Sequence, residues 1–175
     1  HIQTVVMDKT GTITEGKPRV TDLITDGIDK TEMLRIAASA EKGSEHPLAD
    51  AIVEEAKNLN LDLYDVENFE AIPGQGLRAE VNSKIYYLGN LRLINEQNIN
   101  IKNFEAKSMK FAEQGKTPLY FADEDGVLGI ISVADIVKPT SEAAIKEFEA
   151  MGIEVVMLTG DNKKTAEAIR KQLNI

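Results

Sequence analysis

The sequence of 175 residues contains no cysteine and no tryptophan, and its only histidines are His1 and His46. Without cysteine the chain can form neither disulfides nor thiolate metal sites. Two imidazoles are too few for a transition-metal cluster. Any bound metal is therefore expected to be a hard cation on oxygen ligands, which points to Mg²⁺.

Long hydrophobic runs are also lacking. The longest apolar stretch, Val127–Val133, has the length of a strand and is interrupted by Gly129 and Ser132. No run approaches the ~18 apolar residues of a membrane span. There is no signal-peptide pattern, and because the first residue is His1 we expect the chain to be a piece of a larger protein.

Basic residues are fewer than acidic residues: the sequence has 20 lysines and arginines and 29 aspartates and glutamates, which gives a net charge of −9. This balance argues against nucleic acid or an anionic membrane surface as a partner. A content of 42% hydrophobic and 28% charged residues is typical of a globular protein. We expect a soluble, monomeric chain.

Hydrophobic periodicity and turn residues divide the chain into alternating elements. Strands are predicted over 2–7, 20–25, 69–72, 77–81, 84–88, 118–122, 127–133 and 153–158. Helices are predicted over 30–42, 48–59, 91–97 and 104–114, and two more after residues 139 and 162. The order of these elements predicts an α/β protein with two domains. An α+β domain (residues 18–133) has an antiparallel sheet flanked by helices. It is inserted into a parallel-sheet domain made of residues 1–17 and 134–175.

The most informative stretch runs from Asp8 to Thr14, directly after the apolar run Val5–Met7. That run predicts a buried strand, so Asp8 is expected at the carboxyl edge of a parallel sheet, where α/β proteins build their sites. Gly11 permits a tight turn, and Thr10 and Thr12 offer donors to an oxyanion. The alternative is a solvated turn after a strand.

This stretch resembles the phosphorylation motif of P-type ATPases, which belong to the haloacid dehalogenase superfamily and have a Rossmannoid phosphorylation domain. The resemblance implies that Asp8 attacks the γ-phosphate of ATP and becomes an aspartyl phosphate. It implies that Lys9 offsets phosphate charge and that Asp8 and Thr10 hold Mg²⁺. Thr159 and Asp161 resemble the superfamily's second phosphate-binding motif, at a helix N-terminus.

Glu41 and His46 lie in the connection between two predicted helices. Ser44 is predicted to cap the second helix, with Pro47 in its first turn. His46 then lies at the positive end of a helix dipole, which favours a neutral imidazole, whereas Glu41 lies at a helix C-terminus, where its charge is unfavourable. A lone His and a lone Glu are most often structural.

The segment also resembles the Ser-Glu-His-Pro-Leu signature of the heavy-metal-transporting P-type ATPases. In that family the histidine and an upstream glutamate hold the adenine of ATP, so the resemblance gives this role to His46 and Glu41.

Gly74 and Gly76 belong to a stretch that fits the dinucleotide fingerprint G-x-G-x-x-A. That fingerprint must open a helix, but the alternation from Leu77 to Val81 predicts a strand, so the Rossmann interpretation is rejected. A glycine pair in a turn remains, either an ordinary hairpin or a place where a flat ligand approaches the backbone. By resemblance to the same pumps, Gly74, Gly76 and Leu77 are expected at the nucleotide.

Gly89 and Asn90 open a predicted helix, and Asn90 is a candidate N-cap. Their similarity to a Gly-Asn pair of the heavy-metal pumps implies a contact near the adenine or ribose. Asp135 and Lys138 resemble an acid and a base at the hinge between the family's two cytosolic domains, and a surface loop pair is an equal alternative.

The resemblance covers almost the whole chain but not the family's Gly-Asp-Gly segment, which completes the Mg²⁺ site beside the nucleophile. We therefore expect this chain to bind ATP without becoming phosphorylated. It is expected to be the nucleotide-binding domain and part of the phosphorylation domain of a bacterial cell-membrane pump, facing the cytoplasm. Its partners would be the pump's membrane domain, its actuator domain and the rest of its phosphorylation domain.

The residues of these motifs most closely resemble those of bacterial copper exporters. A phosphatase with a cap insertion is an alternative, although Thr10 occupies the position where such enzymes have a second aspartate. A regulatory nucleotide-binding module is a third interpretation.

Overall fold

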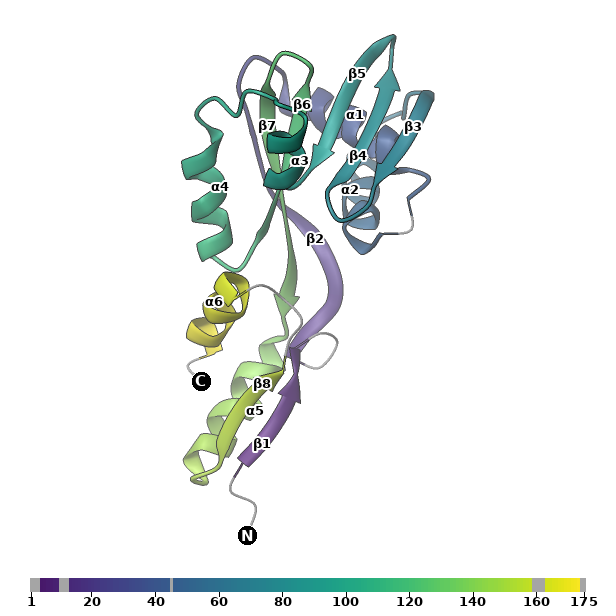
Figure 1. The fold of residues 1–175 in the computed structure, drawn as a ribbon. Coiled ribbons are helices and arrows are strands. Elements are labelled where there is room, and N and C mark those ends of the chain that lie inside the picture. The colour runs from purple at the N-terminus through teal and green to yellow at the C-terminus, as the bar shows by residue number, and fades with distance from the viewer. Residues whose placement is uncertain (1–3, 10–12, 45, 159–162, 174–175) are drawn as a thin grey trace.

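Two β-sheets organise the chain (Figure 1). The computed structural model describes residues 4–9, 13–44, 46–158 and 163–173. The larger sheet is antiparallel and has the strand order β2 (Thr14–Thr25), β7 (Val127–Val137), β6 (Thr117–Asp123), β5 (Lys84–Gly89), β4 (Gly76–Val81) and β3 (Val66–Ile72). The smaller sheet pairs β1 (Thr4–Asp8) with β8 (Glu154–Leu158) in parallel. These sheets confirm the predicted fold class.

Helices cover both faces of the larger sheet, because its central strands carry apolar side chains on both sides. On β6, Leu119 and Phe121 pack in one hydrophobic cluster with α1 (Lys30–Glu41) and α2 (Pro47–Asn58). Tyr120 and Ala122 point to the opposite face. There they pack in a second cluster with residues of α3 (Leu91–Glu96) and α4 (Phe104–Glu113).

The helix starts follow from local capping. Asp29 is the N-cap of α1, and its carboxylate accepts a hydrogen bond from the Glu32 amide at 3.1 Å, as predicted. The predicted cap of α2 is wrong, because His46 and not Ser44 occupies the N-cap position. Pro47 disfavours a helical conformation in the residue before it, and the extended backbone of His46 (φ −69°, ψ 136°) is the one that an N-cap needs.

The small sheet forms the narrow lower part of the molecule with α5 (Pro139–Ala150) and α6 (Lys163–Leu173) (Figure 1). A third hydrophobic cluster holds this part together, and its buried residues are Ile13, Ile145, Val155, Ile169 and Leu173.

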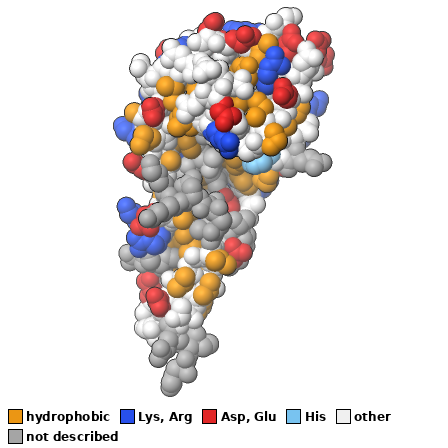
Figure 2. Space-filling view, viewed as in Figure 1, with side chains coloured by type: hydrophobic (Ala, Val, Ile, Leu, Met, Phe, Trp, Pro, Cys, Tyr) orange, Lys and Arg blue, Asp and Glu red, His pale blue; other side chains and the backbone are white. Residues whose placement is uncertain are grey.

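The prediction that both strands of the small sheet are buried is wrong. Val6 is 62% exposed and Leu158 is 61% exposed, because within the described residues helices cover only one face of these two strands. Figure 2 shows hydrophobic side chains on the surface of this narrow part. Met151, predicted to lie inside α5, follows that helix and is also exposed.

Strands β2 and β7 join the two parts of the molecule. They pair from Thr25 and Gly129 in the wide part to Thr14 and Val137 near the small sheet. Their register shifts between Thr14 and Pro18, so the ladder is interrupted where the ribbon enters the narrow part. Both predicted domain boundaries fall within these strands, and the domain division stays a prediction. No helix among the described residues is long and apolar enough to cross a membrane.

Candidate functional site

A cavity of about 410 Å³ opens on the α1–α2 side of the large sheet, within the size range of small-molecule sites. Its walls come from the end of α1, the start of α2, the β3–β4 turn and the end of β5. All the residues predicted to bind the cofactor line it, namely Glu41, His46, Gly74, Gly76, Leu77, Gly89 and Asn90. The structure thus brings together residues that are up to 49 positions apart in the sequence (90 − 41).

Glu41 is the last residue of α1, and its side chain is half-buried. Burial raises the pKa of Glu41 from 4.5 to about 7, although a hydrogen bond with the Ser44 side chain acts in the opposite direction. The Ser44 amide also donates to the Glu41 carbonyl at 2.9 Å, which holds the turn after α1 against the cavity. A half-buried carboxyl group in a cavity is typical of a functional site.

The Glu41 carboxyl binds its proton more tightly in the folded state than in the unfolded state, because its pKa is raised on folding. The free energy of unfolding therefore falls as the pH rises from about 4.5 to 7. Glu41→Gln is therefore expected to leave stability unchanged near pH 4.5 and to increase it by about 1–2 kcal/mol at pH 8. Urea denaturation at both pH values measures this difference. Glu113, the exposed last residue of α4, supplies the matched control, and an equal gain in Glu113→Gln would contradict the assignment.

His46 presents an exposed ring at the cavity mouth. Its Nδ1 accepts a hydrogen bond from the Leu48 amide at 3.2 Å, and its own amide donates to the Ser44 hydroxyl at 3.3 Å. An Nδ1 that accepts carries no proton, so the proton of the neutral ring is on Nε2. The ring is thus held in one orientation by the start of α2 and offers a flat face and one N–H donor.

The glycines of the cavity have two different roles. Gly76 and Gly89 are paired across β4 and β5. A Cβ on Gly76 would lie 2.1 Å from the Leu88 carbonyl oxygen, and one on Gly89 would lie 2.1 Å from the Gln75 carbonyl oxygen. Close packing of the protein backbone therefore requires both residues. Gly74 has φ +74° and no atom within 4 Å of an added Cβ, so it leaves open space beside the turn.

Asn90 ties the β3–β4 turn to the start of α3. Its Oδ1 accepts from the Leu93 amide at 3.1 Å, which confirms the predicted N-cap. Its Nδ2 donates to the Gly74 carbonyl at 2.8 Å, and its amide donates to the Gln75 carbonyl at 2.9 Å. The side chain therefore holds the Gly74 turn in place, and its predicted contact with adenine or ribose stays a prediction.

The cavity also contains residues that the sequence did not single out. Phe69 lines it from β3, and Thr117 and Leu119 line it from β6. They adjoin Leu77, a residue predicted at the nucleotide, which forms part of an apolar wall and is 4% exposed. An aromatic residue shortly before a glycine turn is the only signal that could have marked Phe69 in advance.

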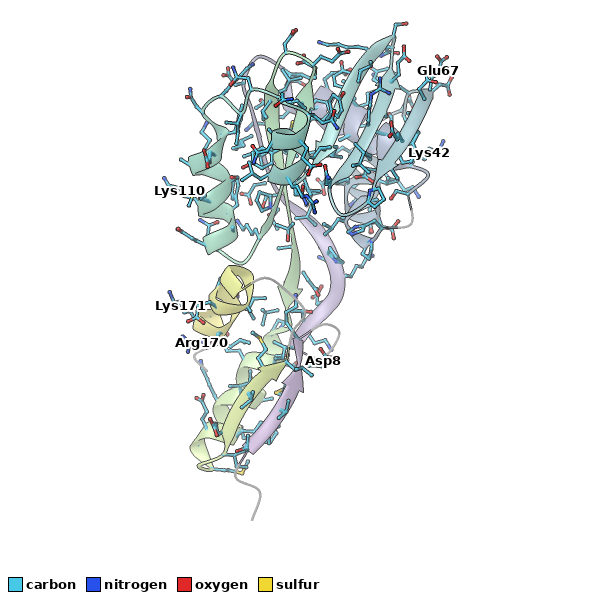
Figure 3. All side chains as sticks on the ribbon, in the orientation of Figure 1. Asp8, Lys42, Glu67, Lys110, Arg170 and Lys171 are labelled. Atoms are coloured by element: carbon cyan, nitrogen blue, oxygen red, sulfur yellow. The ribbon has the colours of Figure 1, made fainter. Side chains whose placement is uncertain are left out.

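Asp8 lies apart from this cavity, at the end of β1 (Figure 3). It pairs with Leu158, the last residue of the parallel strand β8, so the chain leaves both strands at the same edge, as predicted. Lys9 is buried. The other residues predicted for this site, Thr10, Thr159 and Asp161, lie outside the described residues.

Thr14 connects the Asp8 loop to the ribbon. Its buried hydroxyl lies within hydrogen-bonding distance of the Lys9 carbonyl oxygen and of the Asp135 carboxylate. The Lys138 amide donates to the Ile13 carbonyl at 2.9 Å. Asp135 and Lys138 therefore lie beside the chain that follows Asp8, and their role as a hinge acid and base stays a prediction.

Comparisons with known proteins agree with this arrangement. The family model described as haloacid dehalogenase-like hydrolase matches residues 2–175. The chain belongs to the haloacid dehalogenase-like hydrolase family.

Within this family the chain is similar to P-type ATPases, which confirms the predicted resemblance. A copper-exporting P-type ATPase of Staphylococcus saprophyticus is 48% identical over 175 residues, and one of Staphylococcus epidermidis is 46% identical over 176. Each match covers 100% of this chain and 22% of the relative, so the chain spans about a fifth of the length of these relatives.

Solved structures show the same likeness. A zinc-transporting PIB-type ATPase in the E2.Pi state matches with a TM-score of 0.86 and 36% identity, over 99% of this chain and 28% of that one. The N-domain of HMA8, a copper-transporting P-type ATPase, matches with a TM-score of 0.54 and 30% identity, over 65% of this chain and 97% of that one.

Among the described residues of this haloacid dehalogenase-like hydrolase, no group of three or more His, Cys, Asp or Glu side chains is arranged to hold a metal ion. The Asp8 carboxylate is exposed at the sheet edge. Its oxygen atoms are of the hard kind that Mg²⁺ prefers as ligands, and its exposure leaves room for a hydrated ion.

Proposed function

We propose that this chain binds ATP in the cavity at the β3–β4 turn and belongs to a P-type ATPase that exports a heavy-metal ion. The observation that carries the proposal is the convergence of Glu41, His46, Gly74 and Asn90 on one cavity, from three separate stretches of the sequence. The similarity to copper-exporting P-type ATPases supports copper as the transported ion.

The cavity has the chemistry that a purine base requires. Leu48, Leu77 and Leu119 supply apolar walls on which a flat ring can lie out of water. The His46 ring supplies a second flat surface and an Nε2 donor. The Glu41 carboxyl group lies in the same cavity, where in its ionised form it accepts a hydrogen bond from an exocyclic amino group.

In the pump, Asp8 would act as the nucleophile. A carboxylate oxygen of Asp8 forms a bond to the γ-phosphorus of ATP, and the bond from that phosphorus to the oxygen bridging to the β-phosphate breaks. ADP leaves with the bonding electrons, and the phosphoryl group stays on Asp8. Mg²⁺, held by Asp8 and Thr10 when bound, would supply positive charge that offsets the phosphate oxygens.

The proposal assigns residues 18–133 to a nucleotide-binding domain and residues 1–17 and 134–175 to parts of a phosphorylation domain. The chain would face the cytoplasm of a bacterial cell. It would work with the pump's membrane domain, its actuator domain and the rest of its phosphorylation domain.

Isothermal titration calorimetry with ATP, AMP and inorganic triphosphate tests the proposal. Because the residues of the cavity match the base and not the phosphates, ATP and AMP are expected to bind with affinities within about tenfold of each other. Inorganic triphosphate is expected to bind at least tenfold more weakly than either nucleotide. A chain that binds triphosphate as tightly as ATP would contradict a base-binding cavity.

A further inference from the structure

We propose that Phe69 is an additional base-binding residue, whose ring stacks on the nucleobase held in the cavity. Phe69 lies on β3, lines the cavity and is 46% exposed. The inference rests on the proposed nucleotide function and adds to it a residue that neither the motifs nor the similarity to known proteins assigns.

A β-bulge turns Phe69 toward the cavity. On β3, Val66 pairs with Val81 and Ala71 pairs with Leu77, and both partners belong to the core on the α1–α2 side. Five positions separate Val66 from Ala71, so strict alternation would place them on opposite faces. The register shift between Glu67 and Glu70 inserts the additional residue, after which Phe69 and Ala71 both line the cavity.

The backbone at this bulge adopts an unfavourable conformation. Asn68 has φ +50°, in the left-handed region that few non-glycine residues adopt, although asparagine tolerates it best. Its side-chain amide donates to the Glu80 carboxylate at 2.7 Å, which holds the bulge to β4. The left-handed backbone of Asn68 accommodates the additional residue of the bulge.

Phe69 is far more exposed than the phenylalanines that pack in the two cores of the large sheet. Phe104 and Phe121 are 2% and 1% exposed and belong to the cores on the two faces of the sheet, where aromatic rings stabilise the fold most. Phe69 is instead 46% exposed to solvent and lines the cavity. A bound base would cover that surface and remove apolar area from water.

Stacking determines how tightly a base binds more than which base binds, because every base has a flat π-face. Glu41 and His46 offer hydrogen-bonding groups that can distinguish adenine from other bases, whereas Phe69 offers only a ring. Phe69 is therefore expected to strengthen the binding of ATP, AMP and GTP by the same factor.

Phe69→Leu tests this role, since leucine keeps an apolar side chain without an aromatic face. By calorimetry, the affinities for ATP and AMP are expected to fall about tenfold, and that for inorganic triphosphate is expected to stay unchanged. Thermal denaturation without nucleotide should give the wild-type midpoint, because the ring packs in neither core.

A second variant reports stacking directly. The chain contains no tryptophan, so Phe69→Trp introduces a single indole whose fluorescence is expected to change on addition of AMP. Met109→Trp is the matched control, because Met109 is 45% exposed on α4 and does not line the cavity; its fluorescence is expected to stay constant.

The outcomes distinguish this inference from the function on which it rests. If the wild-type chain binds ATP while Phe69→Leu binds it equally well and the indole of Phe69→Trp does not respond, the role of Phe69 is overturned and the cavity remains a nucleotide site. If the wild-type chain binds neither ATP nor AMP, both proposals are overturned. A tenfold loss with Phe69→Leu together with a fluorescence change in Phe69→Trp supports both.

Discussion

Gly76→Ala is expected to destabilise the chain by about 3 kcal/mol and to abolish nucleotide binding. The added Cβ would lie 2.1 Å from the Leu88 carbonyl oxygen and 2.6 Å from the Gly89 Cα. Both are backbone atoms of β5, so the clash can be relieved only by separating two paired strands. The φ of +150° at Gly76 adds strain for any residue with a Cβ. Urea denaturation followed by circular dichroism measures the loss.

Gly74→Ala is the matched control, because Gly74 is two positions away in the same turn. Its φ of +74° also favours glycine, but no atom lies within 4 Å of an added Cβ. Only the conformational cost remains, which is about 1 kcal/mol. If both variants lost the same stability, the close approach of β4 and β5 would not be the reason for a glycine at position 76.

His46→Ala is expected to weaken ATP binding by a factor of at least ten. The variant loses the ring on which a base can stack, and stacking on an aromatic ring is worth about 1–3 kcal/mol per base. It also loses the acceptor that caps α2, since Nδ1 accepts from the Leu48 amide, so the helix start loses about 1 kcal/mol. Calorimetry with ATP measures the first effect, and thermal denaturation measures the second.

His46→Asn separates these two effects, because asparagine is among the best N-cap residues. It is expected to keep the stability of the wild type and to show the weak ATP binding of His46→Ala. Wild-type affinity in His46→Asn would mean that the imidazole does not touch the base.

The sequence predicts the parts of the fold that depend on local chemistry. The segment from Asp29 to Glu32 contains both the cap and the acidic residue of the first turn, and α1 begins there. The alternation after Gly76 distinguishes a hairpin from a dinucleotide-binding turn, and β4 follows that glycine. The cap of α2 was also within reach, because Pro47 restricts the residue before it.

Features that depend on distant parts of the chain were not predictable in the same way. The β-branched run of β8 indicates a strand, but it does not tell how many faces of that strand are covered. The direction of Phe69 depends on the bulge, and strict alternation along the sequence gives no sign of a change of face. The raised pKa of Glu41 depends on burial by elements that the sequence does not place.

The ribbon of β2 and β7 connects the two parts of the molecule, which also meet where α4 contacts α6. Two hydrogen-bonded strands resist stretching, because all the bonds of the ladder would have to slide together. Two strands are marginally stable by themselves, so the part of the ribbon nearest the small sheet is expected to bend more easily than the six-stranded sheet. The ladder is interrupted by register shifts between Thr14 and Pro18 and between Val20 and Asp22, and these are the positions where bending is expected. Movement of the small sheet relative to the large sheet is therefore expected to bend this ribbon more than it stretches it.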